Sequence, residues 1–155
     1  RTLALEGDGS LQHNIQELQL IRTYQLPIKL FILSNGGYAS IYIMQKNNFD
    51  GRFAACVPET DLKFPALRDV AATYHLAYHR IASNDQIEPV LDRVLADNEP
   101  VLCEVCSSIY FDEIPKSMTV AHPDGTFSSS KLENLYPFLP EEEVARNMPN
   151  WEDER

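Results

Sequence analysis

The sequence has no long apolar run and no excess of basic charge, and both absences exclude classes of protein. No stretch approaches the 18 consecutive apolar residues that a transmembrane helix needs, so we expect no membrane span. Acidic residues outnumber basic ones by 23 to 13. No basic stripe is present, so nucleic acid is not an expected partner. The acidic excess lies after residue 50, because residues 1–50 carry equal numbers of acidic and basic side chains.

Cysteine is also scarce. The three cysteines are an odd number and do not suggest a disulfide framework. Cys103 and Cys106 have CxxC spacing, but they lie in a predicted strand, where side chains three apart point to opposite faces. No second pair of Cys or His follows at a zinc spacing. We therefore expect buried, reduced thiols and a cytoplasmic location.

Only six glycines occur, and none forms a GxGxxG or GxxxxGK[ST] motif, so dinucleotide and P-loop sites have no support. Four of the six fall in two short motifs, Gly7–Ser10 and Ser34–Tyr38, each of which follows a predicted strand. The strands span residues 2–6 and 27–33. Between them, residues 11–25 repeat apolar side chains at helical spacing. The pattern predicts a parallel strand–helix–strand unit with a right-handed crossover.

In such a unit the carboxyl ends of neighbouring strands form the ligand crevice. Asp8 and Asn35 should meet there, and their oxygen atoms are ligands suited to Mg²⁺ or Ca²⁺. Ser10 stands where a helix N-cap is expected, which would turn free N–H groups and the positive helix end toward the same place. Together these features predict a diphosphate site with a divalent cation. Either motif alone would also suit an ordinary turn.

The alternation of strands and helices continues along the chain. We expect helices at 64–76 and 85–96, strands at 77–82 and 101–106, a helix start at 38–45 and a loop at 46–63. Four such strands predict an α/β fold, a parallel sheet with helices on both faces. Residues 1–108 would form this domain. Residues 109–155 would be a C-terminal extension that packs on another domain or subunit through the cluster at 136–139. The start on a strand without Met suggests a fragment.

The two motifs at this spacing resemble the thiamine-diphosphate motif of the acetolactate synthase and pyruvate decarboxylase superfamily, which has GDG, a gap of mid-twenties length and a double Asn. Further stretches are similar to acetolactate-synthase-like proteins of bacterial polysaccharide clusters, namely 36–41, 49–52, 71–74 and 132–139. Two departures stand out. Ser34 replaces the first Asn, and Tyr42 stands where those relatives often carry Arg.

The resemblance implies a thiamine-diphosphate-binding fold, of which the chain holds the later part of the diphosphate domain, incomplete at its N-terminus. Mg²⁺ would be held by the side chains of Asp8 and Asn35 and by the backbone carbonyl of Gly37. The residues implied to bind the cofactor are Gly7, Asp8, Gly9, Ser10, Asn35, Gly37, Tyr38, Ala39 and Ser40.

The implied reaction is decarboxylation of a 2-oxo acid such as pyruvate, followed by transfer of the two-carbon unit to a carbonyl acceptor. The family's catalytic Glu belongs to a pyrimidine-binding domain of the same protein or of a neighbouring subunit. No catalytic residue is therefore expected in this chain, and the chain alone should be inactive. The whole protein would be a homodimer or homotetramer, and a missing middle domain could hold FAD. The alternative is a non-catalytic remnant or regulatory domain that keeps the fold and the metal site.

Overall fold

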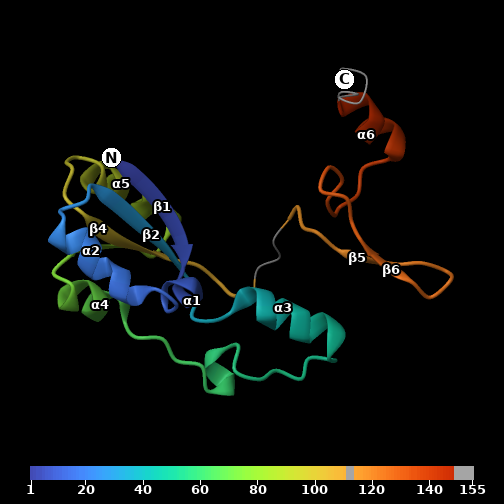
Figure 1. Cartoon of the computed structure of the whole chain (residues 1–155), viewed down its shortest axis with the longest axis horizontal. Coiled ribbons are helices and arrows are strands. Elements are labelled where there is room, and N and C mark those ends of the chain that lie inside the picture. The colour runs from blue at the N-terminus through green and yellow to red at the C-terminus, as the bar shows by residue number, and fades with distance from the viewer. Residues whose placement is uncertain (111–113, 149–155) are drawn as a thin grey trace. The chain divides into compact units, whose positions relative to one another are not determined.

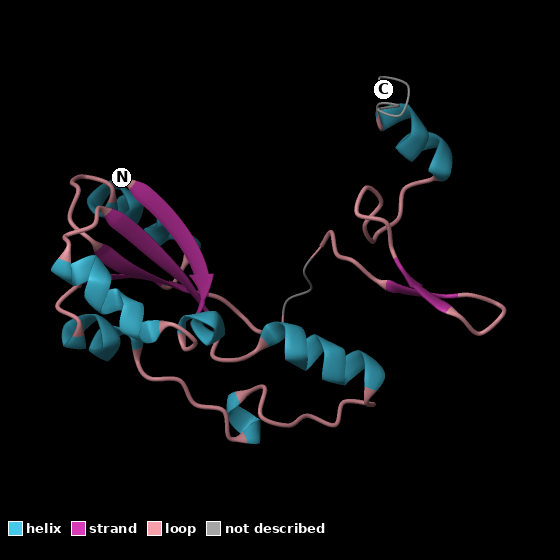
Figure 2. Ribbon diagram, viewed as in Figure 1, coloured by secondary structure: helices cyan, strands magenta, loops and turns pink. Residues whose placement is uncertain are grey.

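A computed structural model describes residues 1–110 and 114–148 of the chain (Figures 1 and 2). The chain divides into two compact units, Arg1–Tyr110 and Phe111–Arg155. The division falls two residues beyond the boundary expected from sequence.

The first unit is built on a parallel sheet of four strands. The strands are β1 (Thr2–Gly7), β2 (Ile28–Ser34), β3 (Ala77–Ile81) and β4 (Val101–Cys106), in the order β1-β2-β4-β3. All three pairings are parallel, as predicted. In this register Gly7 lies beside Leu33, and Ser34 lies beside Cys106. The motifs that follow β1 and β2 therefore leave the sheet at the same edge.

Helices cover both faces of this sheet, which confirms the predicted fold class (Figure 1). On one face, Leu11, Leu18 and Val70 from the flanking helices pack against Leu30, Ile32 and Leu102 of the sheet. On the other face, Val90 and Val94 pack against Phe31, Val101 and Cys103. This second layer stops short of β1, where Leu3 and Leu5 remain 55% and 71% exposed.

The first crossover corrects the sequence prediction of one continuous helix over 11–25. It consists of α1 (Asp8–Leu11), the 3-10 turn η1 (Ile15–Glu17) and α2 (Leu18–Thr23). Asn14, a poor residue for a helix interior, has a non-helical backbone (φ −136°, ψ 30°) and separates the segments. The predicted N-cap was also wrong. Gly7 caps α1, and Ser10 lies inside that helix.

The other helices of the first unit differ from prediction mainly at their ends. α3 (Ala39–Asn48) runs into the predicted loop, which also contains the 3-10 turn η2 (Pro58–Thr60). α4 (Leu67–Thr73) starts three residues later than predicted, because Pro65 disfavours helical backbone at the residue before it. A 3-10 turn, η3 (Asn84–Gln86), begins the predicted helix at 85–96, and α5 (Ile87–Val94) continues it.

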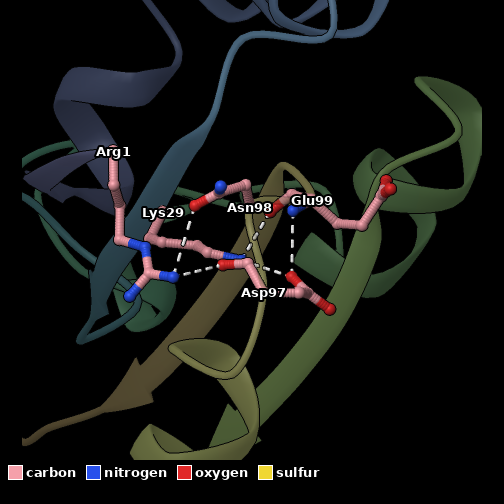
Figure 3. Close-up of polar contacts among 5 residues, drawn as sticks. All are labelled: Arg1, Lys29, Asp97, Asn98 and Glu99. Atoms are coloured by element: carbon pink, nitrogen blue, oxygen red, sulfur yellow. Dashed lines mark hydrogen bonds and ion pairs between the residues drawn. The ribbon is translucent and has the colours of Figure 1, made fainter.

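A buried lysine links neighbouring segments at the amino-terminal edge of the sheet (Figure 3). The Lys29 side chain on β2 has no exposed surface, and its ammonium group binds Asp97 Oδ1 at 3.0 Å. It also donates to the carbonyl of Glu99 at 2.5 Å. Arg1 donates to the carbonyl of Asp97 at 2.7 Å. These contacts join β1 and β2 to the loop that precedes β4.

The second unit contains an antiparallel hairpin of β5 (Thr119–Ala121) and β6 (Phe127–Ser129), followed by α6 (Glu141–Asn147). Among residues 114–119 and 122–148, no side chain is buried. Phe127 is 72% exposed and Leu132 is 84% exposed. Packing of this unit on another domain or subunit stays a prediction.

The three thiols are free, and Cys56 and Cys103 are buried. Burial raises the pKa of Cys103 to about 11, which leaves this thiol protonated and unreactive at neutral pH. Within residues 1–110 and 114–148, no helix is long and apolar enough to cross a bilayer.

Candidate cofactor site

Asp8 and Asn35 lie in direct contact at the carboxyl edge of the sheet. Asp8 is the first residue of α1 and is only 4% exposed. Its Oδ2 atom accepts hydrogen bonds from the backbone N–H groups of Asn35, at 2.9 Å, and Gly36, at 2.7 Å. Its Oδ1 atom accepts a bond from the N–H of Gly9 at 2.9 Å. One carboxylate thus joins the turn after β1 to the loop after β2.

The environment of Asp8 combines two opposing effects. Burial raises the pKa of this carboxyl, and the backbone N–H groups of Gly36, Gly9 and Asn35 counter the rise. A carboxylate oxygen has two lone pairs, so the two bonds to Oδ2 occupy that atom fully. Oδ1 accepts a single bond and keeps one lone pair. Asp8 is therefore preorganised to offer one oxygen to a cation, which would also offset the cost of burying the charge.

The side chain of Asn35 folds back over its own loop. Its Oδ1 atom accepts a hydrogen bond from the N–H of Gly37 at 3.0 Å. That bond fixes the orientation of the amide and leaves the oxygen with one more lone pair. Asn35 is half-buried, as is the adjacent Gly36. The amide oxygen could therefore serve as a second hard ligand, and the backbone N–H of the same residue is bonded to Asp8.

Two glycines are required here by close packing. A Cβ atom at Gly37 would lie 2.5 Å from the carbonyl oxygen of Cys56, the group that accepts the N–H of Tyr38 at 2.9 Å. A Cβ atom at Gly9 would lie 2.7 Å from the ring of Tyr38. Neither position accommodates a side chain without movement of its neighbours.

All nine residues that the sequence singled out for cofactor binding lie in two segments at this edge. Gly7 to Ser10 form the cap and first residues of α1. Asn35 and Gly37 belong to the loop after β2, and Tyr38 to Ser40 form the cap and first turn of α3. Ser10 and Ser40 are exposed, whereas Asp8, Gly9 and Gly37 are buried.

Sequence reasoning missed Glu104, which lies on β4 and lines a cavity of about 410 Å³ together with Asp8 and Ser34. The hydroxyl of Tyr78 donates to Glu104, and the Arg80 guanidinium lies 3.6 Å from the same carboxylate oxygen. A charged residue within the otherwise apolar segment 101–106 was the signal that could have identified it.

The donor set fits a small, hard cation that keeps other ligands. Among the described residues, no cluster of three or more His, Cys, Asp and Glu side chains could hold a metal by itself. Asp8 would be the single carboxylate ligand. Mg²⁺ is commonly held by one or two carboxylates together with phosphate oxygens, so this arrangement suits Mg²⁺ on a diphosphate rather than an all-protein metal cage.

The fold and this edge place the protein in the class of parallel α/β domains that bind their ligand at the carboxyl ends of the strands. Residues 1–105 match the family model for the C-terminal TPP binding domain of thiamine pyrophosphate enzymes. The chain belongs to this family.

Similar proteins agree with the assignment. Acetolactate synthase isozyme 2 large subunit of Escherichia coli (strain K12) is 30% identical over 86% of this chain and 23% of its own length. A probable acetolactate synthase large subunit of Methanocaldococcus jannaschii is 29% identical over 66% of this chain and 17% of its own length.

Among solved structures, the thiamine diphosphate-dependent 4-hydroxybenzoylformate decarboxylase of Rhodococcus jostii RHA1 is similar with a TM-score of 0.61. It is 26% identical, over 72% of this chain and 20% of that one. The chain thus spans less than a quarter of the length of these relatives.

Proposed function

We propose that this chain is the diphosphate-binding part of an acetolactate synthase-like enzyme that decarboxylates a 2-oxo acid such as pyruvate and transfers the two-carbon unit to a carbonyl acceptor. The observation that carries the proposal is the Asp8 carboxylate, which binds the N–H groups of Asn35 and Gly36 and so joins the two family motifs. Bound thiamine diphosphate would supply the electron sink for decarboxylation.

The residues of this chain have the task of holding and orienting that cofactor. Mg²⁺ would be bound by Asp8 Oδ1, by the amide oxygen of Asn35 and by the carbonyl of Gly37. The N–H of Gly9 already donates to Asp8. At α1, the backbone N–H that would contact the phosphate is therefore that of Ser10. The N–H groups in the first turn of a helix have no partner within the helix, and the N–H of Ser10 is one of them. The first turn of α3, at Ala39 and Ser40, would present further N–H groups.

Other parts of the enzyme would complete the reaction. A Glu of a pyrimidine-binding domain, in the same protein or the neighbouring subunit of a homodimer or homotetramer, would act as the acid–base group. Acetolactate synthase-like architecture also leaves room for a middle domain that holds FAD. Ser34 and Tyr42 depart from the family pattern that the sequence resembles, and Tyr42 would be the one that bears on the choice of acceptor.

The metal assignment is tested by replacing Asp8 in the full-length enzyme. Even outer-shell partners of metals typically contribute about 10–100-fold to affinity, so loss of a direct ligand should cost at least that much. We expect Asp8→Ala to weaken Mg²⁺-dependent thiamine diphosphate binding by at least about 10-fold in calorimetric titrations. Asp92→Ala, which removes an exposed carboxylate on α5, is the matched control. Equal affinity in Asp8→Ala and wild type would overturn the assignment.

A further inference from the structure

Tyr38 contacts three segments that are far apart in the sequence. Its ring lies against Gly9 so closely that a Cβ atom there would be 2.7 Å from two ring carbons. The ring of Phe64 meets it edge to face, with centroids 5.4 Å apart and planes at 81°. Its N–H donates to the carbonyl of Cys56 at 2.9 Å. Tyr38 therefore connects the turn after β1 and the loop after β2 to the segment that leads into α4.

The turn that carries Asp8 is held to the core by Leu11 and locally by a hydrogen bond from the Gln12 side chain to the carbonyl of Asp8. α1 contains four residues, and its Gly7 cap makes no side-chain hydrogen bond. Across to the loop after β2 it is held by the Asp8 carboxylate, the group that a cation would also engage. The contact of the Tyr38 ring with Gly9 is independent of any metal ligand. It can keep the two halves of the site in place whether or not the site is loaded.

Gly9 is required for space rather than for backbone freedom. Its φ lies outside the left-handed region, so alanine could adopt the same backbone conformation there. What prevents a side chain is the Tyr38 ring. The Phe64 ring meets the Tyr38 ring edge to face and would itself lie 3.5 Å from the added Cβ atom, an ordinary van der Waals contact. Phe64 and Asp8 both line the adjoining cavity, so displacement of the Phe64 ring would change the cavity that Asp8 also lines.

We propose that Tyr38 is a positioning residue of the cofactor site. Its ring packs on the bare backbone of Gly9, is supported by Phe64, and holds the Asp8 turn against the Asn35 loop. The proposal rests on the proposed function, in which Asp8 and Asn35 share one cation. Within the described chain nothing exchanges a hydrogen bond with the Tyr38 hydroxyl, so the ring alone performs this role.

A double-mutant cycle in the full-length enzyme separates this role from a general effect on folding. Mg²⁺-dependent thiamine diphosphate affinity and the melting temperature without cofactor are measured for each variant. We expect Tyr38→Phe to bind like wild type and Tyr38→Ala to bind at least about 10-fold more weakly. Gly9→Ala should weaken binding similarly, because its methyl group displaces the ring. Tyr24→Ala, at a surface position 69% exposed, is the control.

The double variant is decisive. With the ring removed, the methyl group has nothing to displace, so Gly9→Ala/Tyr38→Ala should bind no more weakly than Tyr38→Ala. Losses that multiply would show that the residues act independently and would overturn the proposal, as would wild-type affinity in Tyr38→Ala. If Gly9→Ala fails to fold, recovery of folding in the double variant supports the contact, and failure of that recovery contradicts it. Wild-type enzyme that does not bind thiamine diphosphate would instead refute the proposed function.

Discussion

At the scale of single residues, Tyr78 on β3 and Glu104 on β4 form a polar pair. The phenol of Tyr78 donates to Glu104, and the Arg68 guanidinium lies 5.2 Å from the centre of the Tyr78 ring. Burial and the adjacent carboxylate raise the pKa of Tyr78 to about 12. The pair lies beside the cavity that reaches Asp8, so it supports the wall of the candidate site.

This pair should produce a defined dependence of stability on pH. Tyr78→Phe keeps the ring over Arg68 but loses a hydrogen bond to a charged group, worth about 1.5–3 kcal/mol. The pKa of Tyr78 is higher in the folded protein, so its contribution is complete below pH 10 and is lost as pH rises toward 12. Urea unfolding between pH 8 and about 11.5 should show the stability gap between wild type and Tyr78→Phe narrowing above pH 10. A gap that stays constant would contradict the pairing, and Tyr24→Phe should show no gap.

At the scale of elements, the strands are tied together at both edges by groups of different kinds. At the carboxyl edge, Asp8 accepts hydrogen bonds from backbone groups. At the amino edge, Lys29 binds Asp97 and Glu99 of the loop before β4. Lys29 is wholly buried, whereas the Asp97 side chain is 60% exposed. Lys29 and the N–H of Glu99 lower the pKa of Asp97, so this carboxylate stabilises the fold above pH 3.8 and loses that effect as pH falls through its own pKa.

Substitution of Asp97 alone and substitution of Asp97 together with Lys29 should change the stability of the fold by different amounts. Asp97→Ala leaves a buried ammonium with a single carbonyl partner, so this variant should be clearly less stable than wild type. Lys29→Met removes the charge and keeps the apolar volume. The double variant Lys29→Met/Asp97→Ala should therefore be more stable than Asp97→Ala alone in urea unfolding at pH 7. A less stable double variant would refute this account. Cofactor affinity should not change, because this edge lies opposite the candidate site.

At the scale of the whole molecule, apolar surface is left uncovered in both units. Leu3 and Leu5 are exposed on β1, and Ile41 and Met44 are 40% and 41% exposed on α3. In the second unit, Phe138 and Leu139 are 47% and 45% exposed. Large exposed apolar patches usually mark contact surfaces. This distribution agrees with the proposal that further domains or subunits cover the chain in the complete enzyme.

By itself, the 155-residue chain should therefore turn over nothing and should self-associate. Loss of an acid–base group typically costs about 10²–10⁴-fold in rate, and half of the proposed cofactor surface would also be missing. The measurement is pyruvate consumption with excess Mg²⁺ and thiamine diphosphate, alongside sedimentation velocity. Sustained decarboxylation above the cofactor-only blank would show that a group in this chain performs the acid–base step and would contradict the proposed division between domains.

Much of the fold and of the candidate site could be predicted from local sequence patterns. The parallel strands and the pairing of the GDGS and SNGG motifs follow from apolar periodicity and from motifs placed at strand ends, and strand β4 was predicted to the residue. Helix ends were less accurate. Asn14 interrupts the first crossover and Pro65 delays α4, because backbone preferences at single residues outweigh the apolar spacing that extends across them.

The sequence by itself determined the class of fold and the edge of the sheet where Asp8 and Asn35 meet, because the alternation of strand and helix signals implies parallel strands whose carboxyl ends lie at one edge. The order of the four strands, β1-β2-β4-β3, came from the tertiary structure. Only the tertiary structure decided how those residues are held. The hydrogen bonds from Asn35 and Gly36 to Asp8, the ring of Tyr38 on Gly9, and the carboxylate of Glu104 near Asp8 join segments that are separated by dozens of residues. Such contacts depend on packing between elements, which no local periodicity encodes.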